Sequence, residues 1–200
     1  MKTRQTGSIA TVLMCAFGVT AAAEREPSIP VQLRESGSYE RMIVATDKPV
    51  LLADLVGGAD LVVEGFLAAQ RSFLDADEAH IYTDSSFTLT SLVKNRRRPG
   101  LMKAGHSIVV RRKSGTVVVD GLRATTIENG FPPFAEKGRY LLFLKETTEP
   151  NTYVVIAGGS GAFEAGDEIA PMLSLPDAAP RAVPRQSFFG EMKALLKFSE

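Results

Sequence analysis

Hydrophobic and polar side chains alternate most regularly between residues 80 and 94. Ile81, Phe87 and Leu89 occupy odd-numbered positions, whereas Asp84 and the next three even-numbered residues are polar. Because successive side chains of a strand point to opposite faces, this alternation is typical of a half-buried β-strand. The pattern therefore predicts one long strand over this segment.

Shorter runs of β-branched and aromatic residues predict further strands. They cover residues 60–67, 107–113, 116–120, 139–145, 153–157 and 162–164. Ser114 and Gly115 separate two of these runs and predict a short β-hairpin turn. Residues 139–145 are apolar on both faces, which is typical of a central strand. Turn residues recur without a βαβ rhythm, so an antiparallel barrel or sandwich is the predicted architecture.

The region before the first of these strands contains one predicted helical turn. It covers residues 51–56, and Gly57-Gly58 supplies its stop signal. Residues 24–48 are largely polar and are interrupted by Pro27 and Pro30. We therefore expect residues 24–48 to be a flexible lead-in to a domain that covers residues 49–174.

The C-terminal region differs in composition from the rest of the chain. Residues 175–186 are rich in proline and alanine and predict a linker. Residues 187–198 predict an amphipathic helix, because Phe188, Met192 and two leucines lie along one side. Such a helix packs on its own domain, docks on a partner or lies on a membrane surface, and the first arrangement is the commonest.

The N-terminal residues predict a secretory signal peptide over residues 1–23. Lys2 and Arg4 precede the apolar residues 9–19, and Ala21-Ala22-Ala23 supplies a cleavage site with small side chains. The apolar run is shorter than the roughly 20 residues that span a bilayer, which favours cleavage over a membrane anchor. We therefore predict an exported protein, periplasmic or extracellular, without a transmembrane anchor after cleavage.

The charge and the cysteine content of the chain argue against a nucleic-acid partner and against disulfide bonds. The formal net charge of the chain is 0, and removal of the signal peptide leaves about −2, so nucleic acid is not an expected partner. The single cysteine, Cys15, lies inside the signal peptide, so we expect no disulfide in the mature chain. Lipidation of Cys15 is the alternative, but Met14 stands where lipoprotein signals have a small residue.

The order of the predicted segments resembles a known family. Residues 59–65 (ADLVVEG) open a strand, a long strand runs over residues 82–94, a hairpin follows, and residues 138–144 (GRYLLFL) form a central strand. This order resembles the N-terminal domain of tissue inhibitors of metalloproteinases and the related netrin-like modules. It is most similar to uncharacterised exported bacterial proteins that share the pattern.

The resemblance implies a mainly β fold with a five-stranded, OB-like Greek-key barrel that binds through one face and its loops. A short helical turn would precede the first strand, and an amphipathic helix would follow the barrel. The inhibitors chelate the protease zinc through an N-terminal cysteine, whereas the predicted mature chain begins at Glu24 and has no cysteine. Inhibition by that route is therefore not implied.

Candidate catalytic residues are few. Gly158–Ala162 (GGSGA) differs from the nucleophile elbow Gly-x-Ser-x-Gly at its last residue, and no helix signal follows Ser160. His80 and His106 both precede Ser160, whereas hydrolases with that elbow place the histidine after the serine. Asp84 and Asp120 are candidate paired carboxylates for acid–base chemistry, but nothing in the sequence places them together. We therefore predict a protein that is not an enzyme.

A candidate metal site also lacks its required pattern. Asp75, Asp77 and Glu78 resemble the start of a calcium loop, but the glycine and the distal glutamate of such a loop are missing. His80 and His106 do not have the spacing of a zinc pair. We therefore predict no metal ion and no cofactor.

One dense basic run remains as a candidate contact surface. Arg96, Arg97 and Arg98 are consecutive, and Arg111 and Arg112 lie on a nearby predicted strand. These arginines either form a solvated loop and strand edge or contact a partner, which would be an envelope or extracellular protein or an anionic glycan.

Together these observations predict an exported, non-catalytic binding module. An envelope or secreted protease inhibitor that acts through the barrel loops is the first alternative, and a hydrolase that uses Ser160 is the second.

Overall fold

The computed structural model describes residues 27–44, 50–96, 102–173 and 181–197. Within these ranges the protein is mainly β, with eleven strands in two sheets, three α-helices and one short 3-10 turn. No described helix is both long and apolar enough to span a bilayer. The predicted signal peptide, with Cys15, lies outside the described residues.

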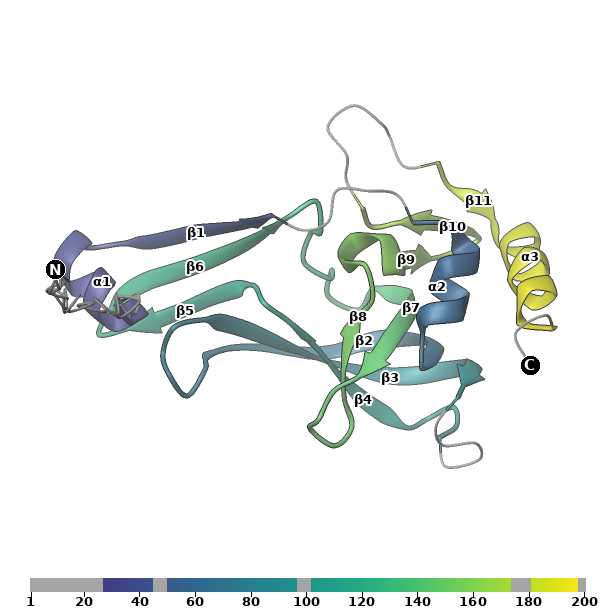
Figure 1. Ribbon diagram of the computed structural model, residues 1–200, viewed down its shortest axis with the longest axis horizontal. Helices are drawn as coiled ribbons and strands as arrows, with labels where there is room; N and C mark the ends of the chain where they lie inside the picture. The colour runs from purple at the N-terminus through teal and green to yellow at the C-terminus, as the bar shows by residue number, and fades with distance from the viewer. Residues whose placement is uncertain (1–26, 45–49, 97–101, 174–180, 198–200) are drawn as a thin grey trace, which may run out of the picture.

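The larger sheet contains eight strands in the order β11-β10-β9-β7-β2-β3-β4-β8 (Figure 1). Their bounds are β2 (Leu61–Leu74), β3 (Ile81–Asn95), β4 (Ser107–Arg112), β7 (Arg139–Glu146), β8 (Thr152–Val155), β9 (Ala162–Ala165), β10 (Glu168–Pro171) and β11 (Val183–Pro184). The predicted central strand is confirmed, because β7 pairs with β2, β8 and β9.

Five strands of this sheet pair in a ring. β2 pairs with β3, β3 with β4 and β7 with β2, all antiparallel, whereas β4 pairs with β8 in parallel. An additional antiparallel pairing of β7 with β8 completes the ring. Because β9, β10 and β11 continue outward from β7, the sheet is not a simple five-stranded barrel.

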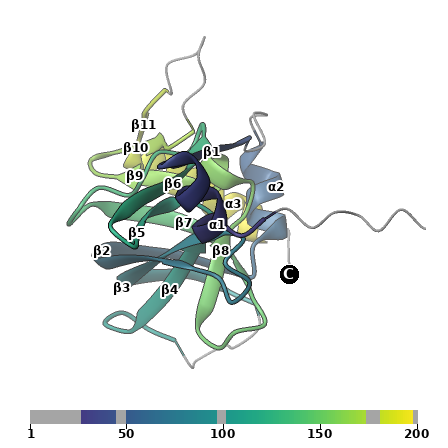
Figure 2. The same cartoon turned by 90° about the vertical axis from the view of Figure 1, so that its left-hand side faces the viewer.

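The smaller sheet has the order β1-β6-β5, with β1 (Tyr39–Val44), β6 (Leu122–Asn129) and β5 (Gly115–Val119). β1 runs parallel to β6, and β5 is antiparallel to it. The end-on view in Figure 2 shows this sheet stacked over β2, β3 and β4. The molecule therefore has two β layers at this end.

The predicted hairpin at Ser114 and Gly115 is wrong. β4 pairs with β3 and β8, whereas β5 pairs with β6, so the chain crosses from the larger sheet to the smaller one at this point. Gly115 has φ +129°, a conformation that side chains rarely adopt. A Cβ at Gly115 would also lie 2.2 Å from Thr83 Oγ1, so the crossing requires glycine.

The predicted flexible lead-in over residues 24–48 is also wrong for its described part. Residues 27–44 contain α1 (Ile29–Ser36) and β1. Pro30 lies in the first turn of α1, where its fixed φ favours a helix, and Gly37 ends the helix with φ +77°. Ile29 and Leu33 are each 1% exposed and pack with Ile81 of β3 and Ala124 of β6.

The main core lies inside the ring of strands. Phe87 on β3 and Tyr140 on β7 are fully buried, as their place in predicted strands implies. Phe134, from the Pro-Pro-Phe loop before β7, packs edge-on against both rings, with centroids 5.1 Å from Phe87 and 4.9 Å from Tyr140. That loop therefore closes one end of the core.

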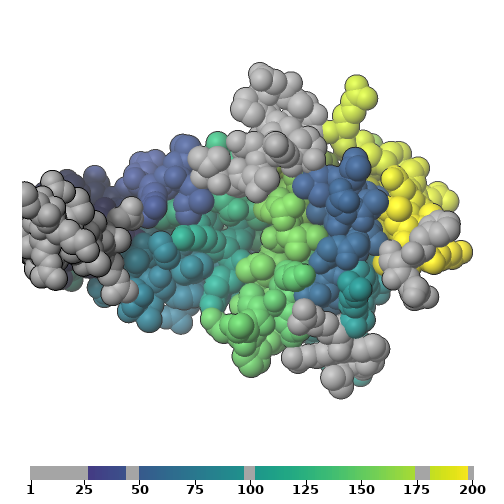
Figure 3. Space-filling view, in the orientation of Figure 1, coloured from purple at the N-terminus to yellow at the C-terminus, as the bar shows by residue number. Residues whose placement is uncertain are grey.

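α2 (Leu52–Gly58) and α3 (Arg185–Lys197) lie together at one end of the molecule (Figure 3). Both contribute to a second core, in which Phe188 and Met192 of α3 pack with Leu55 of α2 and Phe143 of β7. The predicted helical turn is confirmed as α2. The predicted amphipathic helix is confirmed as α3, which begins two residues earlier and packs on its own domain.

A buried ion pair also holds α3 in place. Glu64 on β2 is 1% exposed, and its carboxylate lies 2.5 Å from Arg185 Nη2 and 2.6 Å from Arg139 Nε. Arg185 is the first residue of α3, and its guanidinium lies over the Phe189 ring. The pairing ties the start of the helix to the centre of the larger sheet.

We expect Arg185→Ala to loosen α3, because it removes one of the two cations that contact the buried Glu64 carboxylate. The free energy of unfolding should fall by about 2 kcal/mol, and amide hydrogen exchange should accelerate in α3 more than in β7. Arg181→Ala is the control, because Arg181 is exposed in the segment just before the helix. Equal exchange rates in the two variants would contradict this role of Arg185.

Candidate functional site

A cleft of about 350 Å³ lies between the two sheets. Its walls come from β2 and β3 on one side, from β5 and β6 on the other, and from the residues that follow β6. The residues that line it are Gln70, Ser72, Thr83, Ser85, Arg112, Ser114, Gly115, Thr116, Thr125, Thr126, Ile127, Glu128, Phe131, Pro132 and Pro133. Seven of these fifteen residues are serine or threonine, and the space that the fifteen residues enclose is called the cleft below.

The wall from the larger sheet is built by cross-strand pairs of polar residues. Gln70 pairs with Ser85, and its Nε2 donates to Ser85 Oγ over 3.1 Å. Ser72 pairs with Thr83, and their hydroxyl oxygens are 2.8 Å apart. The two pairs are separated by two residues along each strand. Because alternate residues of a strand point to the same face, all four side chains lie on one face of the sheet.

The wall from the smaller sheet comes from alternate residues of β6. Thr116 on β5 and Thr125 on β6 are directly opposed, with their hydroxyl oxygens 3.0 Å apart, but their side chains point to the exposed face of this sheet. Thr126, the next residue of β6, is 4% exposed. The structure gives its side-chain hydroxyl no hydrogen-bond partner among the described residues, and this hydroxyl is not one of their fully buried unpartnered atoms, so it is accessible from the cleft.

An ion pair connects the two walls. Arg112 on β4 is 6% exposed, and its Nε and Nη2 donate to Oε2 of Glu128 on β6 over 3.2 and 3.1 Å. The guanidinium also donates to the carbonyls of Phe131 and Pro132 and lies 3.5 Å from the centroid of the Phe131 ring. Burial lowers the pKa of Arg112, and the Glu128 carboxylate opposes that shift.

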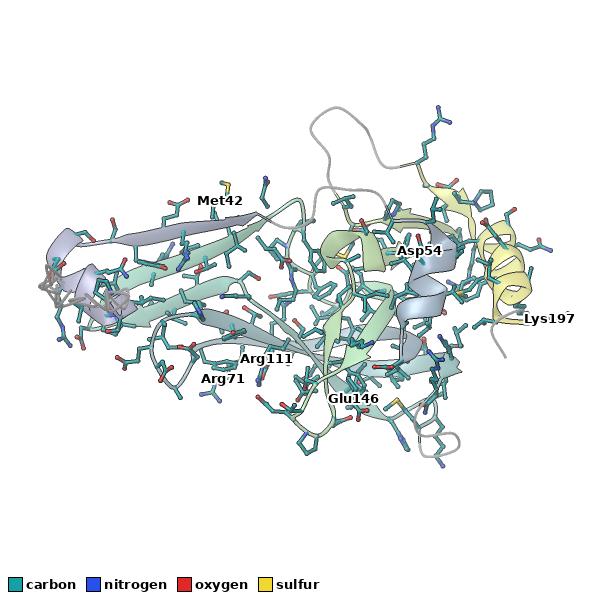
Figure 4. The ribbon with its side chains drawn as sticks, viewed as in Figure 1. Met42, Asp54, Arg71, Arg111, Glu146 and Lys197 are labelled. Atoms are coloured by element: carbon teal, nitrogen blue, oxygen red, sulfur yellow. The ribbon has the colours of Figure 1, made fainter. Side chains whose placement is uncertain are left out.

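Arg111 occupies the opposite face of the same strand. Its guanidinium donates to both carboxylate oxygens of Asp84, over 2.7 and 2.9 Å, and pairs with Glu149. The hydrogen bond with Asp84 is the main cause that raises the pKa of Arg111. Figure 4 shows Arg71 and Arg111 together on the side of β2 and β3 that faces away from the smaller sheet.

The structure therefore does not bring the predicted arginines into one patch. Arg112 is buried in the cleft wall, Arg111 lies on the other face, and Arg96 is exposed just after β3. Arg97 and Arg98 lie outside the described residues. A partner surface that includes Arg96 stays a prediction, and Arg112 is not available to it.

Ser160 lies in η1 (Gly158–Gly161), the 3-10 turn before β9, and is 6% exposed. A nucleophile elbow instead presents its serine at the surface. Added Cβ atoms would lie 2.8 Å from the Gly130 carbonyl oxygen at Gly159, and 2.1 Å from the Ile156 carbonyl oxygen at Gly161. The glycines of this motif therefore serve close backbone packing.

The acidic residues between β2 and β3 shape the loop that joins the strands. Oδ1 of Asp75 accepts hydrogen bonds from the backbone N–H groups of Ala79 and His80. The described residues contain no cluster of three metal-ligating side chains. Asp84 and Asp120 do not share a site, since Asp84 pairs with Arg111 and Asp120 with Arg34 of α1.

Sequence reasoning missed the cleft because part of one wall comes from β6, which was not predicted as a strand. Residues 122–129 (LRATTIEN) carry only a partial signal, because Leu122 and Ala124 alternate with Arg123 and Thr125, but the apolar and exposed Ile127 follows the buried Thr126. The weak hydrophobicity of the buried residues concealed that pattern. No local signal shows that this strand lies opposite Ser72 and Thr83.

No protein-family model matches the chain, and its sequence shows no significant match to a curated protein. The resemblance to netrin-like modules therefore rests on the chain's own residues.

Proposed function

We propose that the chain is an exported, non-catalytic binding module and that the cleft is its binding site. The observation that carries this proposal is a cavity of about 350 Å³ whose walls hold polar side chains that are almost fully buried, among them Ser85, Arg112 and Thr126. Ligand sites are usually preformed concave surfaces with a small number of placed polar groups. The cleft has both properties.

The pairing of the charged side chains in the cleft and the types of residue that line it favour binding over catalysis. Its two charged side chains, Arg112 and Glu128, are bound to each other. The residues that line it include no histidine, cysteine or lysine, which are common general bases and nucleophiles. The carboxylate that lines it, Glu128, is held by the Arg112 guanidinium, and no histidine lies beside its serine and threonine hydroxyls to activate them.

We also propose that the ring of β2, β3, β4, β8 and β7 is a five-stranded barrel of the OB type. Support comes from the strand order, since β8 lies between β4 and β7 and the spatial order differs from the chain order, as in a Greek-key connection. The smaller sheet would then be an addition that converts one face of the barrel into a cleft.

A matched pair of tryptophan variants tests the binding function. Gln70 is exposed at the cleft, and Arg71 is exposed on the opposite face of the same strand. The purified protein is incubated with the small-molecule fraction of its host's envelope, and the retained compounds are identified by mass spectrometry. Gln70→Trp should retain a bound compound about tenfold less than wild type, whereas Arg71→Trp should retain it fully.

The same measurement separates binding from catalysis. A binding module returns the compound with its mass unchanged, whereas an enzyme returns a product of different mass. Failure to find any compound that depends on Gln70 but not on Arg71 would contradict the cleft as the binding site.

A further inference from the structure

We infer that the cleft binds a neutral, hydroxyl-rich ligand, namely a saccharide of one or two rings. This inference rests on the proposed function and assigns a ligand class to the same site. Its basis is the combination of the charge, the hydrogen-bonding groups and the size of the cleft.

The charge of the cleft argues for a neutral ligand. Among the described residues that line it, only Arg112 and Glu128 are charged, and their formal charges cancel. The guanidinium of Arg112 is also occupied by the Glu128 carboxylate and by the carbonyls of Phe131 and Pro132. A phosphate or carboxylate ligand would therefore find no open cation, and an ammonium ligand would have to compete with Arg112 for Glu128.

The hydrogen-bonding groups argue for ligand hydroxyls. The side-chain hydroxyl of Thr126 has no partner among the described residues, although the residue is only 4% exposed and lines the cleft. A hydroxyl both donates and accepts, so a ligand hydroxyl can pair with it in either direction. Both hydrogen bonds from Arg112 to Glu128 end on Oε2, which leaves Oε1 as an acceptor for a second ligand hydroxyl.

The remaining surface and the size of the cleft suit a sugar ring. Threonine methyl groups, Ile127, Pro132 and Pro133 supply apolar contacts beside the hydroxyls. A pyranose has the same mixture, with hydroxyls at its rim and C–H groups on its faces. A volume of about 350 Å³ is at the lower end of the range for small-molecule pockets, which fits one or two rings better than a long oligosaccharide.

The test is an NMR titration of the purified protein with maltose, lactose, cellobiose and N,N′-diacetylchitobiose. Glucose 6-phosphate and glucosamine are the charged comparisons. At least one neutral sugar should shift the backbone amides of Gly115 and Thr126 at about 10 mM or below. Neither charged sugar should shift them as strongly.

Thr126→Val removes the unpartnered hydroxyl and keeps the shape of the side chain. We expect it to weaken sugar binding about fivefold to tenfold without lowering thermal stability, because the lost hydroxyl has no partner in the protein. A merely structural threonine would instead change stability and leave affinity unchanged. Thr88→Val, at an exposed position of β3 outside the cleft, is the control and should bind as wild type.

The outcomes distinguish this inference from the proposed function. Tighter binding of a charged sugar, no response to any neutral sugar, or unchanged affinity in Thr126→Val would each overturn the saccharide assignment. If the envelope experiment still finds a compound that depends on Gln70, the binding function survives that result. If neither experiment finds a ligand, both proposals fail.

Discussion

Arg112→Met is expected to lower the free energy of unfolding by about 3 kcal/mol, because it leaves the Glu128 carboxylate without its cation. The variant also removes the donors to the carbonyls of Phe131 and Pro132 and the contact with the Phe131 ring. Methionine has a similar length and is apolar, so the loss reports the missing guanidinium rather than a cavity. Chemical denaturation monitored by circular dichroism would measure it.

Arg111→Met is the matched control, one residue away on the same strand. Its guanidinium is about one-fifth exposed and pairs with carboxylates at the surface, where such pairs contribute about 1 kcal/mol or less. Removing Glu128 as well should restore part of the loss in Arg112→Met, since no uncompensated charge then remains. If Arg111→Met and Arg112→Met lowered the free energy of unfolding equally, burial of the Arg112–Glu128 pair would not increase its contribution to stability.

Gly161→Ala is expected to destabilise the protein by about 3 kcal/mol or more, because its Cβ would lie 2.1 Å from the Ile156 carbonyl oxygen. That atom belongs to the backbone, so no side-chain rotation relieves the contact. The strands on either side, β8 and β9, both pair with β7, which limits how far the turn can move. The melting temperature measured by calorimetry should fall by several degrees.

Gly57→Ala is the control for this substitution. Gly57 lies in α2, and a Cβ there would meet no atom within 4 Å. Alanine also favours a helix over glycine by up to about 1 kcal/mol, so this variant should be as stable as wild type or slightly more stable. If Gly161→Ala melted at the wild-type temperature, the motif around Ser160 would have a purpose other than close packing.

The parts of the fold that could be predicted are those with a strong local pattern. The alternation in β3, the apolar run in β7 and the apolar turn of α2 each reflect burial that neighbouring residues share. β1 lacks such a pattern because most of its described side chains are exposed, and in β6 the buried residues, Ala124 and Thr126, are only weakly hydrophobic. The two strands also depend on a parallel pairing between distant segments. α1 was concealed by Pro27, which precedes it, and by Pro30, which lies in its first turn.

Local patterns also fail to predict the positions of single residues in the candidate site. A strand places Arg111 and Arg112 on opposite faces, but the sequence does not say which face is covered. The answer depends on Glu128, which belongs to the other sheet and pairs with only one of them. Thr126 likewise has no distinguishing local signal, because its burial comes from strands more than forty residues earlier in the chain.

The crossing of the chain at Gly115 has a consequence for selectivity. Here the backbone passes directly from one wall of the cleft to the other, with Gly115 packed against Ser72 and Thr83, while Arg112 and Glu128 join the walls a second time. These two connections, one covalent and one ionic, fix the distance between the walls. If the cleft binds a ligand as proposed, that distance would limit the thickness of the molecule that enters it.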